Sequence, residues 1–242
     1  MKHLKTIFSV LVLAAVVSCA KTQTPGGQVS FEVASNQHID DVTRSNVSDF
    51  TELPSTADFI ISVSCEELEY TWNGKISEWD AATVLLAGEY TVTASYGTIY
   101  EEGFGKPFFT GDAAFTIKGG EQIAVSIPVD LGNTVVRMTF TDSFKNYYPE
   151  YSFKLTRDGN TIVDFVKGET RAAFVDGWKF KLEGILIGEM TQTTISKDYS
   201  NLNPATAYTF NFDVTNVGGA SLTIKFNDTV ETIDLGDHEL ND

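Results

Sequence analysis

The chain has 242 residues with 17 basic and 33 acidic side chains, and its formal net charge is −16 at pH 7. A balance this acidic repels nucleic-acid phosphates and anionic lipid head groups, which argues against DNA- or RNA-binding proteins. The length suffices for two cores of ordinary size or for one large β-domain.

The chain begins with a basic stretch that includes Lys2 and Lys5, and an apolar run follows over residues 7–17. This run has the length of a signal-peptide core, whereas a membrane-spanning helix needs about 20 residues. It ends at Cys19 in a pattern that resembles the lipobox of bacterial lipoproteins, in which the cysteine thiol receives the lipid. We expect residues 1–18 to be removed and Cys19 to anchor the chain to a membrane. An ordinary secretory leader with an incidental cysteine is the alternative.

Without this leader, 15 basic and 33 acidic residues remain, a formal charge of −18. Residues 19–27 are polar and contain Pro and Gly, so we expect a flexible tether. Acylation of Cys19 would leave Cys65 as the only thiol, and no internal disulfide could then form. Cys65 continues the alternation of Phe59, Ile61 and Val63, which predicts a core residue rather than a reactive thiol.

Strand patterns dominate the remaining chain. Aromatic and β-branched residues alternate with polar ones at the period of two that a half-buried strand requires. These runs lie at residues 29–33, 90–96, 123–129, 136–140, 151–155, 178–182, 208–214 and 222–226. In one of them, Trp178, Phe180 and Leu182 are expected on the buried face. Turn residues between the runs favour hairpins, so the sequence predicts an all-β protein built from antiparallel β-sandwiches.

A division into two tandem domains is expected near residues 130–133, where strand patterns flank a short turn. The predicted domains are residues 28–131 and 132–242. Residues 34–56 are rich in Ser, Thr, Asn and Asp and are expected to form a long loop. The stretch 142–151 fits either one helical turn or an irregular crossover.

Four motifs in order carry a resemblance to a known family. They are Leu-Ala-Gly-Glu-Tyr-Thr-Val-Thr-Ala-Ser-Tyr-Gly at 86–97, Gly-Phe-Gly-Lys-Pro-Phe-Phe-Thr-Gly at 103–111, Phe-Thr-Ile at 115–117 and Leu-Gly-Asn-Thr-Val-Val at 131–136. The chain from Gly27 onward resembles a family of uncharacterised Bacteroidota lipoproteins, a domain of unknown function grouped with fimbrillin-like proteins. The resemblance implies two transthyretin-like or immunoglobulin-like sandwiches and a role in adhesion or pilus-like assembly.

The resemblance also implies that a cut after an N-terminal arginine could process the chain, and Arg44 lies in the predicted loop. Loss of the first strand would then open a sheet edge to a strand donated by a partner. An ordinary solvated arginine is the alternative. No acidic residue lies between Cys19 and Glu32. Surface-exported lipoproteins of this group often carry an acidic run there, so both a surface and a periplasmic orientation stay open.

Catalytic groups are sparse. Outside the leader the histidines are His38 and His238, both in polar segments, and neither offers a base for a Ser or Cys nucleophile. Cys65 and these scattered histidines do not suggest zinc. Adjacent carboxylates lack the separation of a glycosidase pair, and the acidic C-terminal residues do not match an EF-hand. We therefore expect no enzyme, no cofactor and no metal site.

Aromatic residues are the candidate glycan or partner contacts, because exposed rings offer flat apolar faces. They are Trp72, Trp79, Tyr96, Tyr100, Phe104, Phe108 and Phe109. Core packing is the alternative for each, and the Gly-rich segment 97–111 is the first place to expect a binding loop. The leading hypothesis is a lipid-anchored outer-membrane protein of the cell envelope, with an adhesion or pilus-assembly role through protein or glycan contacts. The alternative is a glycan-binding lipoprotein that supports polysaccharide capture.

Overall fold

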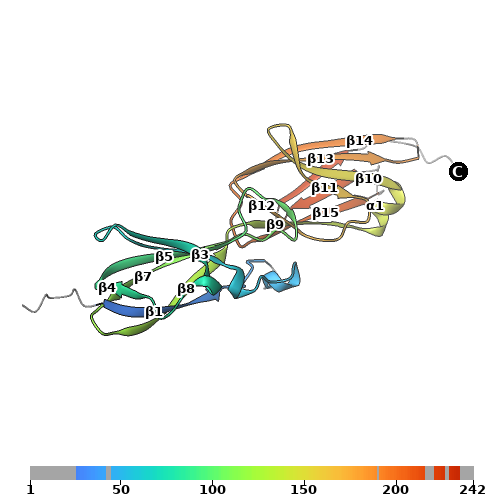
Figure 1. Ribbon diagram of the computed structural model, residues 1–242. Coiled ribbons are helices and arrows are strands. Elements are labelled where there is room, and N and C mark those ends of the chain that lie inside the picture. Colours follow the sequence, from blue (N-terminus) through green and yellow to red (C-terminus); the bar gives the residue numbers. More distant parts are fainter. Residues whose placement is uncertain (1–25, 42–44, 190, 216–220, 227–228, 235–242) are drawn as a thin grey trace, which may run out of the picture.

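The computed structural model describes residues 26–41, 45–189, 191–215, 221–226 and 229–234. Two β-rich lobes lie end to end (Figure 1). We call them the N-terminal half (residues 26–131) and the C-terminal half (residues 134–234). Within these ranges, the regular elements are strands apart from one α-helix and three short 3-10 helices. The prediction of an all-β chain of two sandwiches is confirmed.

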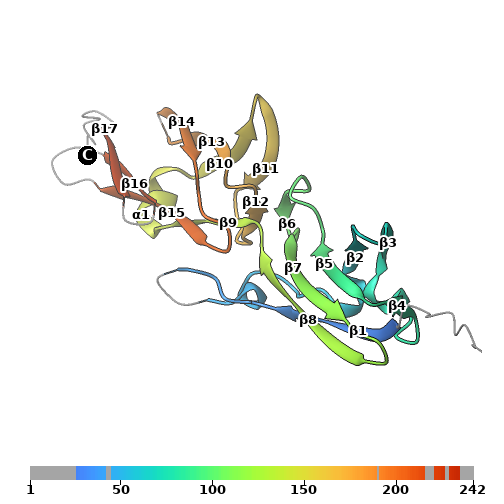
Figure 2. The ribbon, with the colours of Figure 1, turned by 90° about the vertical axis from the view of Figure 1, so that its left-hand side faces the viewer.

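The N-terminal half is one sheet of seven strands in the order β3-β2-β5-β7-β8-β1-β4. Its strands are β1 (Gly26–Ser35), β2 (Ile60–Cys65), β3 (Tyr70–Lys75), β4 (Val84–Leu86), β5 (Gly88–Tyr96), β7 (Phe109–Ile117) and β8 (Gln122–Leu131). Strands β7 and β8 pair only at Phe109–Leu131 and Thr110–Asp130. Beyond these two pairs they separate, so the sheet forms two layers over one core (Figure 2).

The predicted loop at residues 34–56 contains the 3-10 helix η1 (Val47–Asp49), and η2 (Thr56–Asp58) and η3 (Ile76–Glu78) follow later in the N-terminal half. Val47 is completely buried in the first core. This loop is therefore packed against the sandwich in part, because an apolar side chain inside the polar segment reaches the core.

The C-terminal half has a four-stranded sheet, β11-β10-β13-β14, and a six-stranded sheet, β17-β16-β15-β9-β12-β6. Its elements are β9 (Thr134–Phe140), α1 (Asp142–Tyr147), β10 (Glu150–Arg157), β11 (Asn160–Val166), β12 (Ala173–Val175), β13 (Lys179–Ile187), β14 (Gln192–Ser200), β15 (Ala207–Thr215), β16 (Ser221–Phe226) and β17 (Thr229–Asp234). The strand β6 (Gly103–Phe104) comes from the N-terminal half of the sequence. Of the two alternatives for residues 142–151, the helical turn is the one that forms, because the Thr141 hydroxyl caps it by accepting from the Phe144 N–H.

Most strand pairs are antiparallel, and two are parallel. Residues 28–35 of β1 pair in parallel with β8, and residues 135–140 of β9 pair in parallel with β15. In each half the first long strand, β1 or β9, thus pairs in parallel with a strand that comes much later in the sequence, β8 or β15. A strand at the start of the chain is held by a partner almost 100 residues later.

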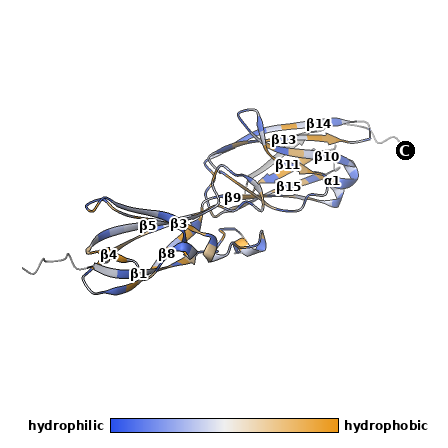
Figure 3. Cartoon of the chain, viewed as in Figure 1, coloured by the Kyte–Doolittle hydropathy of each residue, from blue (hydrophilic) through white to orange (hydrophobic). Residues whose placement is uncertain are grey.

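Side chains alternate between the core and solvent along most strands, as the period-two patterns predict. Figure 3 gives the hydropathy of the residues along each strand. In β5, Tyr90, Val92 and Ala94 are buried while their neighbours are exposed. In β13, Phe180, Leu182 and Leu186 are buried in the same way. The prediction that Cys65 belongs to the core is confirmed, since 3% of it is exposed.

Strands β9 and β12 depart from this alternation because they lie between the two cores. Val135 and Phe174 are cross-strand partners and belong to the first core. Their neighbours Val136 and Ala173 are also partners, and they belong to the second core. Both faces are buried here, which explains why the sequence has continuous apolar residues at these strands. The chain crosses at Gly132–Asn133, within the segment where the sequence predicts a boundary, and the division into two domains stays a prediction.

Candidate functional site

The predicted aromatic pair Trp72 and Trp79 packs against the first strand. The two indole rings lie edge to face at 4.9 Å between centroids. Trp79 also meets the Phe31 ring of β1 at 5.0 Å, and its Nε1–H donates to the Val29 carbonyl oxygen at 2.8 Å. Both tryptophans are half-buried at the margin of the first core. Trp79 therefore helps to hold β1 in place, and Trp72 packs against Trp79.

The other predicted aromatic contacts have different surroundings. Tyr96 is half-buried against Phe59, with ring centroids 5.7 Å apart, whereas Tyr100 is 90% exposed. Phe108 is half-buried, and its backbone N–H donates to the Oδ1 of Asn133. Phe109 is completely buried. Its assignment as a ligand contact is corrected, because β7 turns this ring into the core.

The segment 97–108 reaches across to the C-terminal half. Within it, β6 pairs with β12 through Phe104–Ala173 and Gly103–Phe174 (Figure 2). The Phe104 ring lies 5.1 Å from that of Phe165 at 87°, and the Arg171 guanidinium lies 4.5 Å above its centroid. A stretch expected to be a binding loop is thus an edge strand of the second sandwich in its central part.

An ion pair strengthens this junction. The Glu102 carboxylate accepts from Arg157 Nη1 at 2.6 Å and from Nη2 at 3.1 Å, and 6% of the Glu102 side chain is exposed. Glu102 also accepts the backbone N–H of Asp176 at 2.7 Å. Sequence reasoning missed this pair because the residues are 55 positions apart. Charge-assisted hydrogen bonds shielded from water are strong, so we regard the pair as a clamp between the halves.

Further links join the halves close to the crossing point. The Asp40 N–H donates to the Ala205 carbonyl at 2.8 Å, and the Ala207 N–H donates to the Asp40 carbonyl at 3.0 Å. Asn133 is completely buried, and its carbonyl accepts from the Ala205 N–H at 2.9 Å. Within the described residues, Asn133 Nδ2 is the one buried side-chain nitrogen without a partner.

Trp178 is the second residue that sequence reasoning misplaced. It was expected on the buried face with Phe180 and Leu182, but β13 starts at Lys179 and Trp178 is 64% exposed. The preceding Asp176-Gly177 is a turn signal that could have indicated this. The ring stands beside a groove of about 850 Å³ between the two halves.

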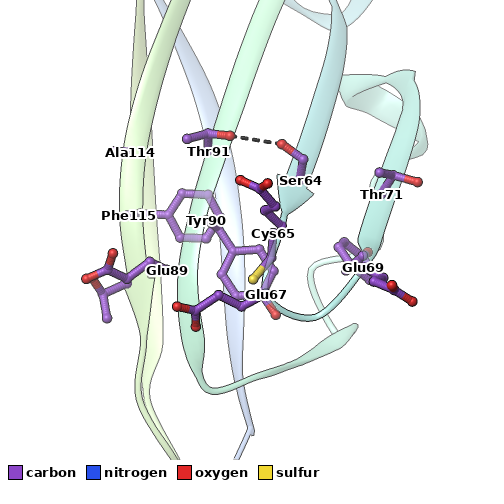
Figure 4. A pocket seen from close by; sticks show the side chains of 13 residues that line it. Ser64, Cys65, Glu67, Glu69, Thr71, Glu89, Tyr90, Thr91, Ala114 and Phe115 are labelled. Carbon is purple, nitrogen blue, oxygen red and sulfur yellow. Dashed lines mark hydrogen bonds between the residues drawn. The ribbon is translucent and has the colours of Figure 1, made fainter.

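A second cavity, of about 830 Å³, lies at the end of the N-terminal sheet, beside the β2–β3 hairpin (Figure 4). Tyr90 and Phe115 stack there at 5.4 Å, and the Tyr90 hydroxyl donates to the Leu86 carbonyl at 2.9 Å. Burial, reinforced by Cys65 and Tyr70, raises the pKa of Tyr90. Glutamates surround the opening, and the lining residues include no histidine. Beside the buried Cys65 thiol, the lining therefore offers no imidazole base.

Three residues considered from the sequence, Cys19, Arg44 and His238, lie outside the residues that the structure describes. Among the described residues, no group of three or more His, Cys, Asp or Glu side chains is arranged to hold a metal ion. No helix in the described ranges is long and apolar enough to cross a bilayer.

Comparison with solved structures finds distant similarities. A fimbrial assembly protein from Parabacteroides distasonis is 7% identical, covering 86% of this chain and 98% of that protein at a TM-score of 0.49. The fimbrial anchor protein Mfa2 from Porphyromonas gingivalis is 12% identical, covering 85% and 98% at a TM-score of 0.41. A Bacteroides eggerthii protein provisionally named for cell adhesion is 8% identical, covering 88% and 96% at a TM-score of 0.45.

Comparison with curated proteins finds no match. The sequence model of one family, described as a domain of unknown function (DUF4493), matches residues 26–236. This range includes every strand of both halves. The expectation of an uncharacterised family with fimbrial and adhesion proteins among its structural neighbours is confirmed. The chain belongs to the DUF4493 family of domains of unknown function.

Proposed function

We propose that this protein is held at the outer membrane by lipid on Cys19 and acts in adhesion or pilus-like assembly. It works through protein contacts made by its sheets. The leader pattern before Cys19 supports the anchor. The acidic chain favours a soluble module outside the membrane surface and disfavours nucleic acid as a partner.

The position of β1 carries the assembly part of the proposal. β1 is the first strand described, and it lies between β8 and β4 in the sheet order. It pairs with β8 over eight residues and with β4 over three. After a cut between β1 and β2, β1 would be joined to the rest of the chain by noncovalent contacts alone and could leave the sheet. Removal of β1 would leave the backbone groups of β8 unpaired, which is a template for a donated strand.

Arg44 follows β1 in the sequence, whereas Cys19 precedes it. A cut after Arg44 would therefore separate both the lipid and β1 from the rest of the chain. The body would then stay on the membrane only through noncovalent contacts with the cut-off segment, among them those made by β8, β4, Trp79 and residues 205–207. The uncut chain would be an anchor, and the cut chain would be a subunit able to accept a strand.

Limited proteolysis of the mature chain with an Arg-specific protease tests the exchange. We expect a cut after Arg44, release of the N-terminal fragment in mild denaturant, and multimers on its removal. A synthetic peptide with the sequence of residues 26–35 should compete with multimer formation. Arg44→Gln is the control and should remain monomeric. A fully cut and stripped chain that stays monomeric would overturn the assembly proposal.

Tryptophan substitutions report on the same step. Trp79→Phe removes the hydrogen bond to the Val29 carbonyl. Trp72→Phe keeps that bond and replaces an indole ring that is half-buried like that of Trp79. One hydrogen bond contributes about 0.5–1.5 kcal/mol, so Trp79→Phe should release the fragment at lower denaturant than Trp72→Phe. Because Trp79 packs against β1 and Trp72 packs against Trp79, the surroundings of these rings give no support to glycan binding through them.

A further inference from the structure

A groove at the junction of the halves has the composition of a ligand site. It has a volume of about 850 Å³. The outer face of β5 and β7, the segment 97–108, the turn before β13 and the connection from β14 to β15 all contribute to its lining. These parts are joined by the β6–β12 pairing and by the ion pair of Glu102 and Arg157. The groove is therefore formed by residues of both halves.

The floor of the groove is a set of cross-strand polar pairs. Thr93 of β5 lies opposite Asp112 of β7, and Thr110 lies opposite Asp130 of β8. All four side chains belong to exposed positions. Asp130 accepts a hydrogen bond from Asn36 Nδ2 at 2.8 Å. In the described part of the chain, the side chains of Thr93, Thr110 and Asp112 have no hydrogen-bond partner and are available to a ligand.

Aromatic rings form the walls. Trp178 is 64% exposed, and Phe108, which also lines the groove, is half-buried. The backbone N–H of Trp178 donates to the Asp176 carboxylate at 3.0 Å. The backbone N–H of Asp176 donates to Glu102, and its carbonyl accepts from Arg157. The turn that carries Trp178 is thus held in place before a ligand arrives, which reduces the entropy lost on binding.

Two glycines let these walls approach closely. A Cβ on Gly177 would lie 2.3 Å from Thr134 Oγ1 and 2.6 Å from the Leu202 carbonyl oxygen. A Cβ on Gly132 would lie 2.6 Å from the Phe108 ring. Larger residues at either position would push the turn or the ring away from the groove.

The charges and donors define the ligand class. Three aspartates line the groove, at 112, 130 and 176, and none of its lining residues is Lys, Arg or His. An anionic ligand is disfavoured by repulsion, and the aspartates are not gathered in a metal-binding cluster among the described residues. Hydroxyl groups that donate and carboxylates that only accept match the hydroxyls of a sugar. An exposed indole offers an apolar face to the CH side of a pyranose ring.

We propose that this groove binds a neutral oligosaccharide. One sugar ring stacks on Trp178, and the hydroxyls of the sugar form hydrogen bonds with Asp112, Thr93 and Thr110. No residue that lines the groove belongs to β1, and the proposed sugar contacts do not include Asp130, whose partner Asn36 follows β1, so the site does not depend on strand exchange. A chain that fails to polymerise could still bind the sugar, and the two proposals fail separately.

The test uses the mature chain on an array of neutral oligosaccharides built from glucose, mannose, galactose and N-acetylglucosamine. Positive sugars are then titrated by calorimetry. We expect saturable binding that Trp178→Ala and Asp112→Asn each weaken at least tenfold, a loss of roughly 1.4 kcal/mol or more. Tyr100→Ala, an exposed aromatic outside the groove, should bind like the wild type. A Trp72→Phe/Trp79→Phe variant has Trp178 as its only tryptophan, so its fluorescence should change on binding.

Three outcomes would overturn the proposal. In the first, no neutral sugar binds at millimolar concentration; in the second, binding survives both Trp178→Ala and Asp112→Asn. In the third, a Lys- and Arg-rich peptide binds in a Trp178-dependent way while sugars do not, which would assign the groove to a protein partner. Because Trp178 and Asp112 are exposed, their variants should fold, and circular dichroism checks this.

Discussion

Arg157 and Glu102 form a two-pronged ion pair, with Nη1–Oε2 at 2.6 Å and Nη2–Oε1 at 3.1 Å, that joins the two halves of the protein. Arg157 is the last residue of β10, and Glu102 precedes β6. Arg157 also donates to the carbonyls of Lys179 and Asp176. One guanidinium thus organises the segment 97–108 and the turn that carries Trp178.

Loss of this pair should destabilise the protein. Glu102→Ala removes the carboxylate partner of the Arg157 guanidinium and the acceptor of the Asp176 N–H, and we expect the free energy of unfolding to fall by about 1–3 kcal/mol. The matched control is Glu101→Ala. Glu101 pairs with Lys106 at 2.8 Å in an exposed setting, so its loss should cost less than about 1 kcal/mol. Urea unfolding of both variants checks this, and equal losses would contradict the clamp.

The pairing of β6 depends on its aromatic residue. Phe104→Ala removes the contacts with Phe165 and Arg171. A fully buried aromatic changed to alanine costs about 3–5 kcal/mol, so a half-buried one should cost roughly 2 kcal/mol. Amide hydrogen exchange should rise at residues 103–104 and 173–175. Tyr100→Ala should leave both exchange and stability unchanged, and faster exchange in that control would count against a specific role for Phe104.

Glu169 should make stability depend on pH. Hydrogen bonds from the Arg171 side chain lower the pKa of Glu169 to about 2. In the unfolded chain a Glu titrates near about 4.3, so the folded state favours the ionised form. This contribution is present above about pH 4.3 and is lost as the pH falls toward about 2. The stability difference between wild type and Glu169→Gln should therefore shrink over that window. A carboxyl NMR titration with a midpoint near 4.3 would show this reasoning to be wrong.

Cys65 should be protected from thiol reagents. It is 3% exposed beneath the Tyr90 end of the N-terminal sheet (Figure 4). In a Cys19→Ala chain, Cys65 should react with a disulfide reagent slower by roughly a hundredfold or more than in the urea-unfolded chain, because reaction requires opening of the core. Cys65→Ser should give no signal. Rapid labelling of the native chain would mean that this end of the sandwich opens locally.

Much of the fold follows from local sequence patterns. The alternation in β5, β8 and β15 marks one buried face for each strand, and Cys65 was placed in the core by the same period. The lipobox-like pattern before Cys19 is equally local, because it depends only on adjacent residues. Such features are determined by the sequence alone, since they need no knowledge of what lies across from a residue.

The tertiary structure decided which aromatic residues are available. The sequence suggests Trp72 and Trp79 as ligand contacts, yet Trp79 packs on β1 and Trp72 packs on Trp79. Trp178 follows the pattern of a core residue, yet the turn at Asp176 places it beside the groove. An alternation of apolar and polar residues shows that one face of a strand is buried. It does not show which layer covers that face or at which residue the strand begins. Those answers depend on the stacking of two halves, and on the pairing of β6 with β12 about 70 residues further along the chain.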